Sequence, residues 1–344
     1  EPETKSAAAS YFADSRERTS LEFVSSGCML LDQVLGGGYA LGRMSNLIGD
    51  KSTGKTLLAI EACANFARDY KDGRLRYLEA ESAFDKGYAA ALGMPVDRVE
   101  FVGDAQMVDK KGNSDRTVEF WYEDLQRFMA DLKGRPGLYV VDSLDALSDR
   151  AELGRDISDG SYGGAKPKKI GELFRRLVGE IEKSRVLLLV ISQIRDKIGV
   201  TFGETKMRAG GRAMDFYATH CLWLAQIETL KKTVAKIDRP IGVTIRAKCK
   251  KNKIGLPFRE CDFPLLFGYG IDDLTAGVEW LLDSGREELL ADLDLTKAGY
   301  KVRLGSLRNK GGQEVRDLRH ALSAVIVREW ASVEAGFLPK AGKY

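Results

Sequence analysis

Histidine and paired cysteine are scarce in this sequence, and their scarcity excludes several kinds of site. The 344 residues include two histidines, His220 and His320, and five cysteines. The cysteines are odd in number and form no CxxC pair, so their spacing indicates neither a disulfide framework nor a zinc knuckle. With two histidines, we expect neither a histidine-based metal site nor a catalytic triad.

Long apolar runs and a large net charge are also missing. No apolar run approaches the roughly 20 residues that span a bilayer, and the N-terminus lacks the pattern of a signal peptide. Hydrophobic residues make up 44% and charged residues 30%, the balance of a globular protein with a sizeable core. The formal net charge is +3, so a nucleic-acid site must lie in local clusters of basic residues. We expect a cytosolic globular protein.

Short β-rich runs alternate with helical patterns between about residues 21 and 272. This alternation is typical of βαβ units and predicts an α/β fold with a mainly parallel, twisted sheet that helices cover on both faces. Residues 1–20 are predicted to form an N-terminal arm that docks on the next subunit. Helical stretches at 276–282, 286–290 and 315–335 predict a small α-rich C-terminal domain at 273–344. The apolar runs are 44–48, 75–78, 99–102, 138–141, 186–191, 221–224 and 241–245.

A glycine-rich motif stands between the apolar run 44–48 and the helical run 57–66. It fits G-x-x-x-x-G-K-[ST] and consists of Gly49, Asp50, Lys51, Ser52, Thr53, Gly54, Lys55 and Thr56. In such a loop backbone N–H groups converge on phosphates, Lys55 reaches the β- and γ-phosphates, and Thr56 offers a hydroxyl to Mg²⁺. Because the flanking strand and helix are those the motif requires, the sequence predicts binding of ATP with Mg²⁺.

Polar residues follow three of the other apolar runs. Asp142 ends the run 138–141, where a P-loop enzyme places the carboxylate that holds Mg²⁺, although an aspartate there is also a common helix N-cap. Glu79 and Glu81 follow the run 75–78, and strand alternation puts both on one side, so geometry alone leaves the choice of a catalytic carboxylate open. Gln193 follows the run 186–191. Its amide could sense a γ-phosphate, or it could be an ordinary polar residue at a strand end, and the sequence alone leaves both roles open.

Beyond this loop, the chain resembles the RecA family of recombinases along nearly its whole length. The string YLEAESAFD, followed by Tyr88, is similar to the family segment that carries the catalytic glutamate and the adenine contacts. The resemblance implies that Glu81 is the general base and that Asp85 and Tyr88 meet the adenine. The string ISQIRDKIGVTFG resembles the segment with the sensor glutamine, here Gln193, which leads into the second DNA-binding loop.

A third string, KKNKIGLPF, resembles the family segment that places two lysines in the ATP site of the neighbouring subunit. The matching residues are Lys251 and Lys253. Phe267 stands where the family has a tyrosine near the neighbouring nucleotide, which keeps the stacking but loses a hydroxyl. Asp215 stands where the family has a lysine that is thought to couple ATP to the DNA loop. In this chain the coupling would have to run through other residues. The arm resembles that of bacteriophage strand-exchange proteins, and the basic C-terminus argues against autoinhibition by tail carboxylates.

Two glycine-containing basic segments match the DNA-binding loops of the family. Basic side chains in a flexible loop can follow a phosphate backbone and release counterions. For the loop at about 156–169, the alternative to DNA binding is a solvated basic surface. For the loop at about 195–212, the alternative is that its apolar residues pack on the core, as they more often would in a monomer. The resemblance implies DNA contacts for Lys168, Arg175, Arg195, Ile198, Phe202, Gly210, Gly211 and Arg212.

The function that the resemblance implies is ATP-dependent homologous recombination. The protein would form a helical filament on single-stranded DNA, pair it with a homologous duplex and hydrolyse ATP when DNA is bound. The implied partners are further copies of the chain, both forms of DNA, and loading and single-strand-binding proteins, in the cytoplasm of a prokaryotic or phage-infected cell. A ring-shaped helicase and a regulatory ATPase are the alternatives, but the paired lysines argue against the first and the presence of Glu81 against the second.

Overall fold

The computed structural model describes residues 21–153, 165–196, 206–208 and 213–339. The arm expected at 1–20 and most of both expected DNA loops lie outside these residues. The same holds for Ile198, Phe202, Gly210, Gly211 and Arg212.

Six mutually parallel strands form the part of the main sheet that carries the phosphate loop. Their spatial order is β9, β3, β7, β6, β4 and β5. The parallel core confirms the predicted α/β class, and it follows from strands that read as continuous apolar runs. The strands are β3 (Met44–Gly49), β4 (Arg74–Glu79), β5 (Val99–Val102), β6 (Gly137–Asp142), β7 (Val186–Asp196) and β9 (His220–Val234).

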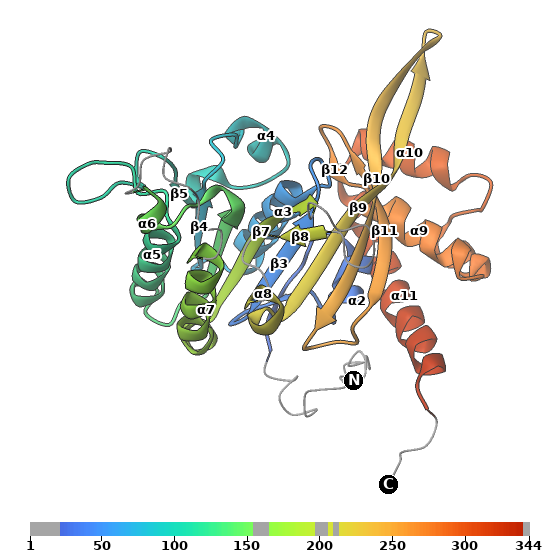
Figure 1. Ribbon diagram of the computed structural model, residues 1–344. Coiled ribbons are helices and arrows are strands. Elements are labelled where there is room, and N and C mark those ends of the chain that lie inside the picture. The colour runs from blue at the N-terminus through green and yellow to red at the C-terminus, as the bar shows by residue number, and fades with distance from the viewer. Residues whose placement is uncertain (1–20, 154–164, 197–205, 209–212, 340–344) are drawn as a thin grey trace.

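Helices cover both faces of these strands (Figure 1), and successive strand residues enter two separate cores. Leu47 packs in one core with Leu58 and Phe66 of α3 (Lys55–Asp69). Its neighbour Ile48 belongs to the opposite core, with Trp121 of α5 (Val118–Asp131) and with residues of α7 (Ala165–Ser184). Because side chains alternate along a strand, a sheet covered on both faces buries every residue of β3.

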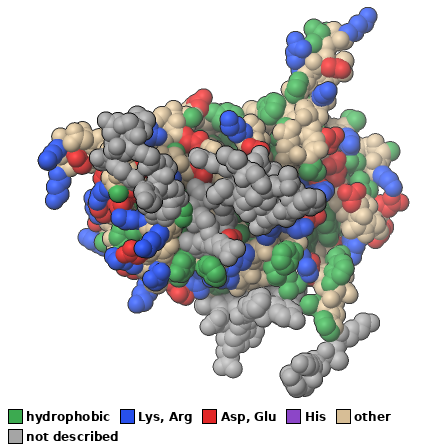
Figure 2. Space-filling view, in the orientation of Figure 1, with side chains coloured by type: hydrophobic (Ala, Val, Ile, Leu, Met, Phe, Trp, Pro, Cys, Tyr) green, Lys and Arg blue, Asp and Glu red, His purple; other side chains and the backbone are tan. Residues whose placement is uncertain are grey.

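The remaining part of the sheet is antiparallel, a feature that the apolar runs do not predict. Strand β9 turns into β10 (Ile237–Asn252), which pairs with β11 (Arg259–Leu266) and then β12 (Gly270–Ile271). The outer part of the β9–β10 hairpin projects from the body and carries basic side chains at its tip (Figures 1 and 2). The strand expected at 241–245 is therefore only the middle of β10. Residues 231–241 are all exposed, so no apolar run marks this part of the hairpin.

Helices follow β12 and pack on the antiparallel side of the molecule. They are α9 (Asp273–Asp283), α10 (Tyr300–Lys310) and α11 (Gln313–Phe337). Helices α9 and α11 contact α2 (Met29–Leu35), and α10 contacts α9 and α11. Trp280 stacks on Trp330 at 5.6 Å between ring centroids. The expected helix at 286–290 is instead a 3₁₀-helix, η3 (Glu287–Leu293), and α10 was not among the expected stretches. No helix of the described chain is long and apolar enough to cross a membrane.

Short elements connect the main ones. The β1–β2 pair stands apart from the main sheet, and β8 pairs with the end of β7. The short elements are β1 (Phe23–Val24), β2 (Tyr39–Ala40), α4 (Lys86–Ala91), η1 (Val96–Arg98), η2 (Leu144–Ala146), α6 (Arg150–Leu153), β8 (Lys206–Arg208) and α8 (Ala213–Tyr217).

Candidate functional site

The phosphate loop (residues 49–56) connects the buried strand β3 to helix α3. Its backbone takes left-handed conformations at Ser52 (φ 57°) and Gly54 (φ 80°). A Cβ at Gly54 would lie 2.5 Å from Leu265 Cδ1, so a side chain here would require Leu265 to shift and would also be strained by the positive φ. Lys55 Nζ donates a hydrogen bond to the Asp50 carbonyl oxygen at 2.6 Å, and burial lowers the pKa of Lys55. The loop therefore places its lysine and the N-terminus of α3 together, the arrangement that binds phosphates.

Asp142, at the end of β6, lies directly beside the phosphate loop. Its Oδ2 accepts hydrogen bonds from Thr56 Oγ1 at 2.9 Å and from the Tyr77 hydroxyl at 2.6 Å. Burial raises the pKa of Asp142, the two hydrogen bonds oppose that change, and the charges of Glu81 and Glu79 add to it. A hydroxyl and a carboxylate in contact form the donor set that Mg²⁺ takes in P-loop enzymes, so these residues fit the ion.

The two carboxylates that follow β4 have different surroundings. Glu79 Oε1 accepts the backbone N–H groups of Glu81 (3.0 Å) and Ala83 (3.1 Å), so this side chain caps its own loop. Glu81 Oε1 instead accepts from Ser143 Oγ at 2.5 Å and from Gln193 Nε2 at 2.7 Å. The structure thus brings the side chains of Glu81 and Gln193 together, whereas Glu79 accepts hydrogen bonds from the backbone of its own loop.

A set of polar contacts that the sequence did not predict supports the loop of Glu81. Arg116 donates a hydrogen bond to the Ala80 carbonyl oxygen and forms an ion pair with Asp104 at 3.1 Å. Asp104 also accepts from Ser82 Oγ at 2.6 Å, and the Ala80 N–H donates to the Asp142 carbonyl oxygen at 2.7 Å. Arg116 and Asp104 lie in a long loop without apolar periodicity, so no local pattern indicates their role.

The ends of four parallel strands converge at this edge of the sheet. Gly49 at the end of β3 is in register with Gln193 of β7, and Glu79 of β4 with Asp142 of β6. The Gln193 N–H donates to Asp145 Oδ2 at 2.7 Å, which fixes the backbone next to the sensor amide. In open parallel sheets, ligands bind outside the carboxyl ends of the strands, and this edge is the corresponding position here.

A pocket of about 310 Å³ continues from the phosphate loop toward α4. Residues 52–57 line one side, and Phe84, Asp85 and Tyr88 line another, so both predicted adenine contacts border the same cavity as the loop. The Asp85 carboxylate also caps α4 by accepting the Tyr88 N–H at 2.9 Å. Phe267 does not line this pocket within the chain: its side chain is exposed, two residues beyond Leu265, which abuts Gly54.

Lys251 and Lys253 lie at the opposite edge of the sheet from the phosphate loop. Lys251 is in register with Cys221 of β9, and Cys221 with Asn46, three residues before Gly49 on β3. Both ammonium groups contact the carboxyl end of the short helix α8. Lys251 Nζ donates to the carbonyl oxygens of Asp215 and Phe216, the latter at 2.8 Å, and Lys253 Nζ to that of Phe216 at 3.1 Å. The structure does not bring these lysines to the phosphate loop of their own chain.

Helix α7 carries the two DNA candidates whose side chains are described. Lys168 and Arg175 are both exposed, and their spacing of seven residues puts them on nearly the same helix face. Of the other candidates, Arg195 lies on β7 in register with Met207 of β8.

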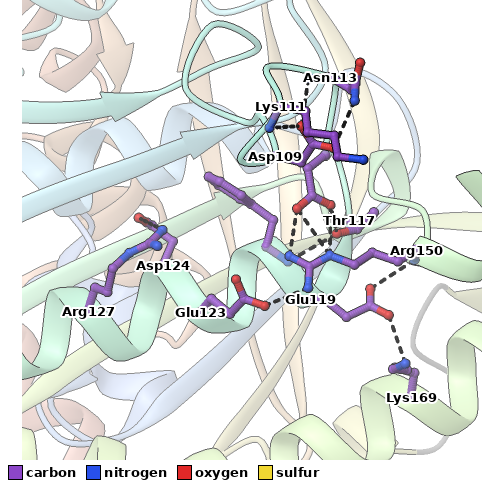
Figure 3. A network of polar contacts seen from close by, with 12 residues as sticks. Asp109, Lys111, Asn113, Thr117, Glu119, Glu123, Asp124, Arg127, Arg150 and Lys169 are labelled. Atoms are coloured by element: carbon purple, nitrogen blue, oxygen red, sulfur yellow. Dashed lines mark hydrogen bonds and ion pairs between the residues drawn. The ribbon is translucent and has the colours of Figure 1, made fainter.

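The helices on both sides of residues 154–164 are tied to α5 by ion pairs. Arg150 contacts Asp115 and Glu123, each at 2.7 Å. Lys169 at the start of α7 contacts Glu119 of α5 at 2.9 Å. Figure 3 shows Glu119 and Glu123 on α5, with Lys169 and Arg150 reaching this region from separate elements. Lys169 is thereby engaged with a carboxylate, whereas Lys168 points to solvent.

The loop, the Asp142–Thr56 contact and the Glu81–Gln193 pair define a P-loop ATPase site at the carboxyl edge of a parallel sheet. Comparison with known proteins specifies the class further. The family model described as the RecA N-terminal domain matches residues 7–272.

Three curated relatives, each called Protein RecA, are similar to most of the chain. The relative from Nostoc punctiforme is 33% identical over 268 residues, 78% of this chain and 69% of that protein. The one from a Synechococcus species is 34% identical over 270 residues, covering 78% and 66%. The one from Limosilactobacillus reuteri is 33% identical over 295 residues, covering 85% and 73%.

This chain belongs to the RecA family. It is a RecA-type homologous recombinase and a DNA-dependent ATPase, and it binds ATP and DNA and assembles into filaments as the family does.

Proposed function

We propose that ATP hydrolysis in this recombinase uses Glu81 as the general base, with Gln193 as the group that senses the γ-phosphate. The observation that carries this proposal is the 2.7 Å contact between the two side chains, next to the phosphate loop. Glu81 would accept the proton of the attacking water, and Lys55 would neutralise charge that develops on the transferred phosphoryl group. When Gln193 turns from Glu81 to a γ-phosphate, the carboxylate becomes available to the water.

Mg²⁺ would be held by Thr56 and Asp142. When bound there, Mg²⁺ would supply positive charge that lowers the cost of charge development on the phosphates. The chain's own contribution is the carboxylate, which the Thr56 and Tyr77 hydroxyls hold in one orientation. The nucleoside would be enclosed by residues 52–57 together with Asp85 and Tyr88. Phe267 would instead contact the nucleotide of a neighbouring subunit.

The ATP site would be completed by Lys251 and Lys253 of a second copy. Their position at the opposite edge of the sheet from the phosphate loop supports this, because they cannot serve the loop of their own chain. In this assembly the two lysines would exchange the carbonyl oxygens of α8 for phosphate oxygens. Since α8 follows the second predicted DNA loop, nucleotide and DNA would both act on this short helix.

DNA would be held by the two basic loops at about 156–169 and 195–212, with Lys168 and Arg175 on the adjoining face of α7. Both side chains are exposed on one face, which supports a shared phosphate-backbone contact. The remaining organisation that we propose is an arm at 1–20 that docks on the next subunit, an ATPase core at 21–272 and a small domain at 273–344. Loading and single-strand-binding proteins would assist the filament.

A strand-exchange assay tests the proposed function. The protein is mixed with ATP, Mg²⁺, circular single-stranded DNA and a linear homologous duplex, and joint molecules are resolved on a gel. We expect joint molecules with the homologous duplex and none with a heterologous one. Filaments visible by electron microscopy without joint molecules would overturn the function.

A further inference from the structure

Tyr77 is a buried residue of β4 that none of the sequence patterns singled out. Its side chain has no solvent exposure, and its hydroxyl donates to Asp142 Oδ2 at 2.6 Å. The strands β4 and β6 are neighbours, and Tyr77 is in register with Val140. Asp142 lies two residues beyond Val140, so the side chains of Tyr77 and Asp142 lie on the same face of the sheet.

The contact fixes one particular oxygen of the carboxylate. In the described part of the chain, both side-chain hydrogen bonds to Asp142 fall on Oδ2, one from Tyr77 and one from Thr56. Two donors on the same oxygen restrict rotation of the carboxylate about its last bond and leave Oδ1 available for a metal-bound water. Hydrogen bonds to an ionised acceptor are roughly twice as strong as those between neutral groups.

The ring of Tyr77 is itself held by aromatic neighbours. Its centroid lies 4.6 Å from that of Phe84 and 5.9 Å from that of Phe101, and those two rings are 5.3 Å apart. Phe84 lines the nucleotide pocket beside Asp85. One side chain thus touches the wall of the nucleoside pocket with its ring and the carboxylate of the proposed metal site with its hydroxyl.

We propose that Tyr77 is the positioning residue for the metal carboxylate of this ATPase: its hydroxyl fixes Asp142 in the orientation that binds Mg²⁺ through water. Thr56 alone cannot do this, because its hydroxyl oxygen is itself a proposed ligand of the ion. Tyr77 belongs to the sheet, and its ring is packed against Phe84 and Phe101. This inference rests on the proposed Mg²⁺ site at Thr56 and Asp142.

The test compares Tyr77→Phe with a matched control from the same sheet. Tyr139 is equally buried, and its hydroxyl donates to Asp124 at 2.8 Å, so Tyr139→Phe removes a tyrosine–carboxylate hydrogen bond outside the site. Binding of a fluorescent, non-hydrolysable ATP analogue is titrated in EDTA and at increasing Mg²⁺, without DNA. Bound Mn²⁺ is followed in parallel by electron paramagnetic resonance.

Tyr77→Phe should bind the analogue in EDTA as the wild type does, because the ring and its packing remain. Its half-saturating Mg²⁺ concentration should rise about 10-fold, the lower end of the loss seen when an outer partner of a metal ligand is removed. The bound-Mn²⁺ spectrum should change as well. Tyr139→Phe should leave both readouts unchanged. Identical Mg²⁺ titrations for wild type and Tyr77→Phe, or equal shifts in the two tyrosine variants, would overturn the inference.

Two further variants keep the test decisive. If the missing hydroxyl leaves Tyr77→Phe unfolded, 4-fluorophenylalanine at position 77 fills the same space without donating a hydrogen bond. Asp142→Asn separates the inference from the proposed site. Should Asp142→Asn leave the Mg²⁺ dependence intact, the proposed metal site is wrong; should it abolish the dependence while Tyr77→Phe has no effect, only the role of Tyr77 is wrong.

Discussion

Replacing Glu61 by glutamine should stabilise this protein at neutral and alkaline pH and have little effect below pH 5. Glu61 lies on α3, and its carboxylate is enclosed between Gly27 and Gly270, both in left-handed conformations. A Cβ at Gly27 would lie 2.8 Å from Oε2, and one at Gly270 would lie 2.9 Å from Oε1. Burial raises the pKa of Glu61 from 4.5 to about 7, although Arg319 and the Ile271 N–H lower it.

The sign of the effect follows from proton binding. Between pH 4.5 and about 7 the folded protein keeps the proton of Glu61 and the unfolded chain releases it. The folded state therefore binds more protons, and the free energy of unfolding falls as the pH rises through this range. Above pH 7 the free energy of unfolding is lower by at most about 3 kcal/mol than at low pH. This figure follows from about 1.36 kcal/mol for each pH unit between the two pKa values.

The neighbours of Glu61 remain satisfied in the glutamine variant. The amide oxygen can still accept the Ile271 N–H. Arg319, on α11, keeps Asp273 of α9 at 2.8 Å and the Gly27 carbonyl oxygen at 3.0 Å. The other charged groups close to this cluster are Asp32 of α2, whose pKa burial raises to about 6, and Arg68 of α3.

Thermal unfolding at pH 5, 6, 7 and 8 measures the effect, at one protein concentration and without ATP or DNA. At roughly 2.1 cal/mol/K of unfolding entropy per residue, 3 kcal/mol corresponds to a rise in Tm of about 4 °C for this chain. Glu61→Gln should show this rise at pH 8 and only about a quarter of it at pH 5. Glu288→Gln, which neutralises an exposed glutamate, is the control. A Tm difference that is constant from pH 5 to pH 8, or a variant less stable at pH 8, would refute the reasoning.

Three other predictions concern the site. Glu81→Ala should bind the ATP analogue normally but lose at least about 100-fold in DNA-stimulated turnover, the usual contribution of a general base; normal turnover in a phosphate-release assay would show that another carboxylate acts. Replacing Lys251 and Lys253 together by alanine should abolish DNA-stimulated hydrolysis and leave analogue binding by dilute protein unchanged, whereas an unchanged stimulated rate would argue against an intersubunit site. Replacing Lys168 and Arg175 by glutamine should reduce the slope of log affinity against log salt for single-stranded DNA by about 1.4, roughly 0.7 per phosphate contact; an unaltered slope would place both side chains off the DNA.

The sequence predicts the phosphate loop well because everything that defines it is local. Its glycines, Lys55 and Thr56 fall within eight consecutive positions, between an apolar run and a helical one. Glu79 and Glu81 show the limit of local reasoning. Alternation gives both the same side, and their contacts distinguish them in the folded chain: Glu81 accepts from Gln193 and Ser143, whereas Glu79 accepts from the backbone of its own loop.

Tyr77 and Arg116 could not be found from local patterns. A tyrosine in an apolar run is ordinarily a core residue, and its hydroxyl gains a role only because β4 and β6 become neighbours although some 60 residues separate them in the chain. The outer part of the long β9–β10 hairpin could not be predicted for a different reason. Its outer residues are exposed on both faces, so the hydrophobic pattern that indicates a strand is absent there.

The position of the two lysines constrains how copies of this chain assemble. Gly49 and Met44 lie five residues apart along β3, which corresponds to about 16 Å at roughly 3.3 Å per residue. The phosphate loop follows Gly49, while the Lys253 N–H donates to the Thr219 carbonyl oxygen and the Thr219 N–H to that of Met44. The two halves of the proposed ATP site thus occupy opposite edges of one sheet.

A surface that binds a different surface on the next copy gives a head-to-tail contact, which produces a ring if the rotation closes and a helical filament if it does not. In either assembly a bound nucleotide bridges two copies, so nucleotide binding favours assembly through mass action. If the proposed site is shared in this way, hydrolysis would weaken the contact on both sides at once, and we expect ATP to be coupled to filament turnover rather than to base pairing.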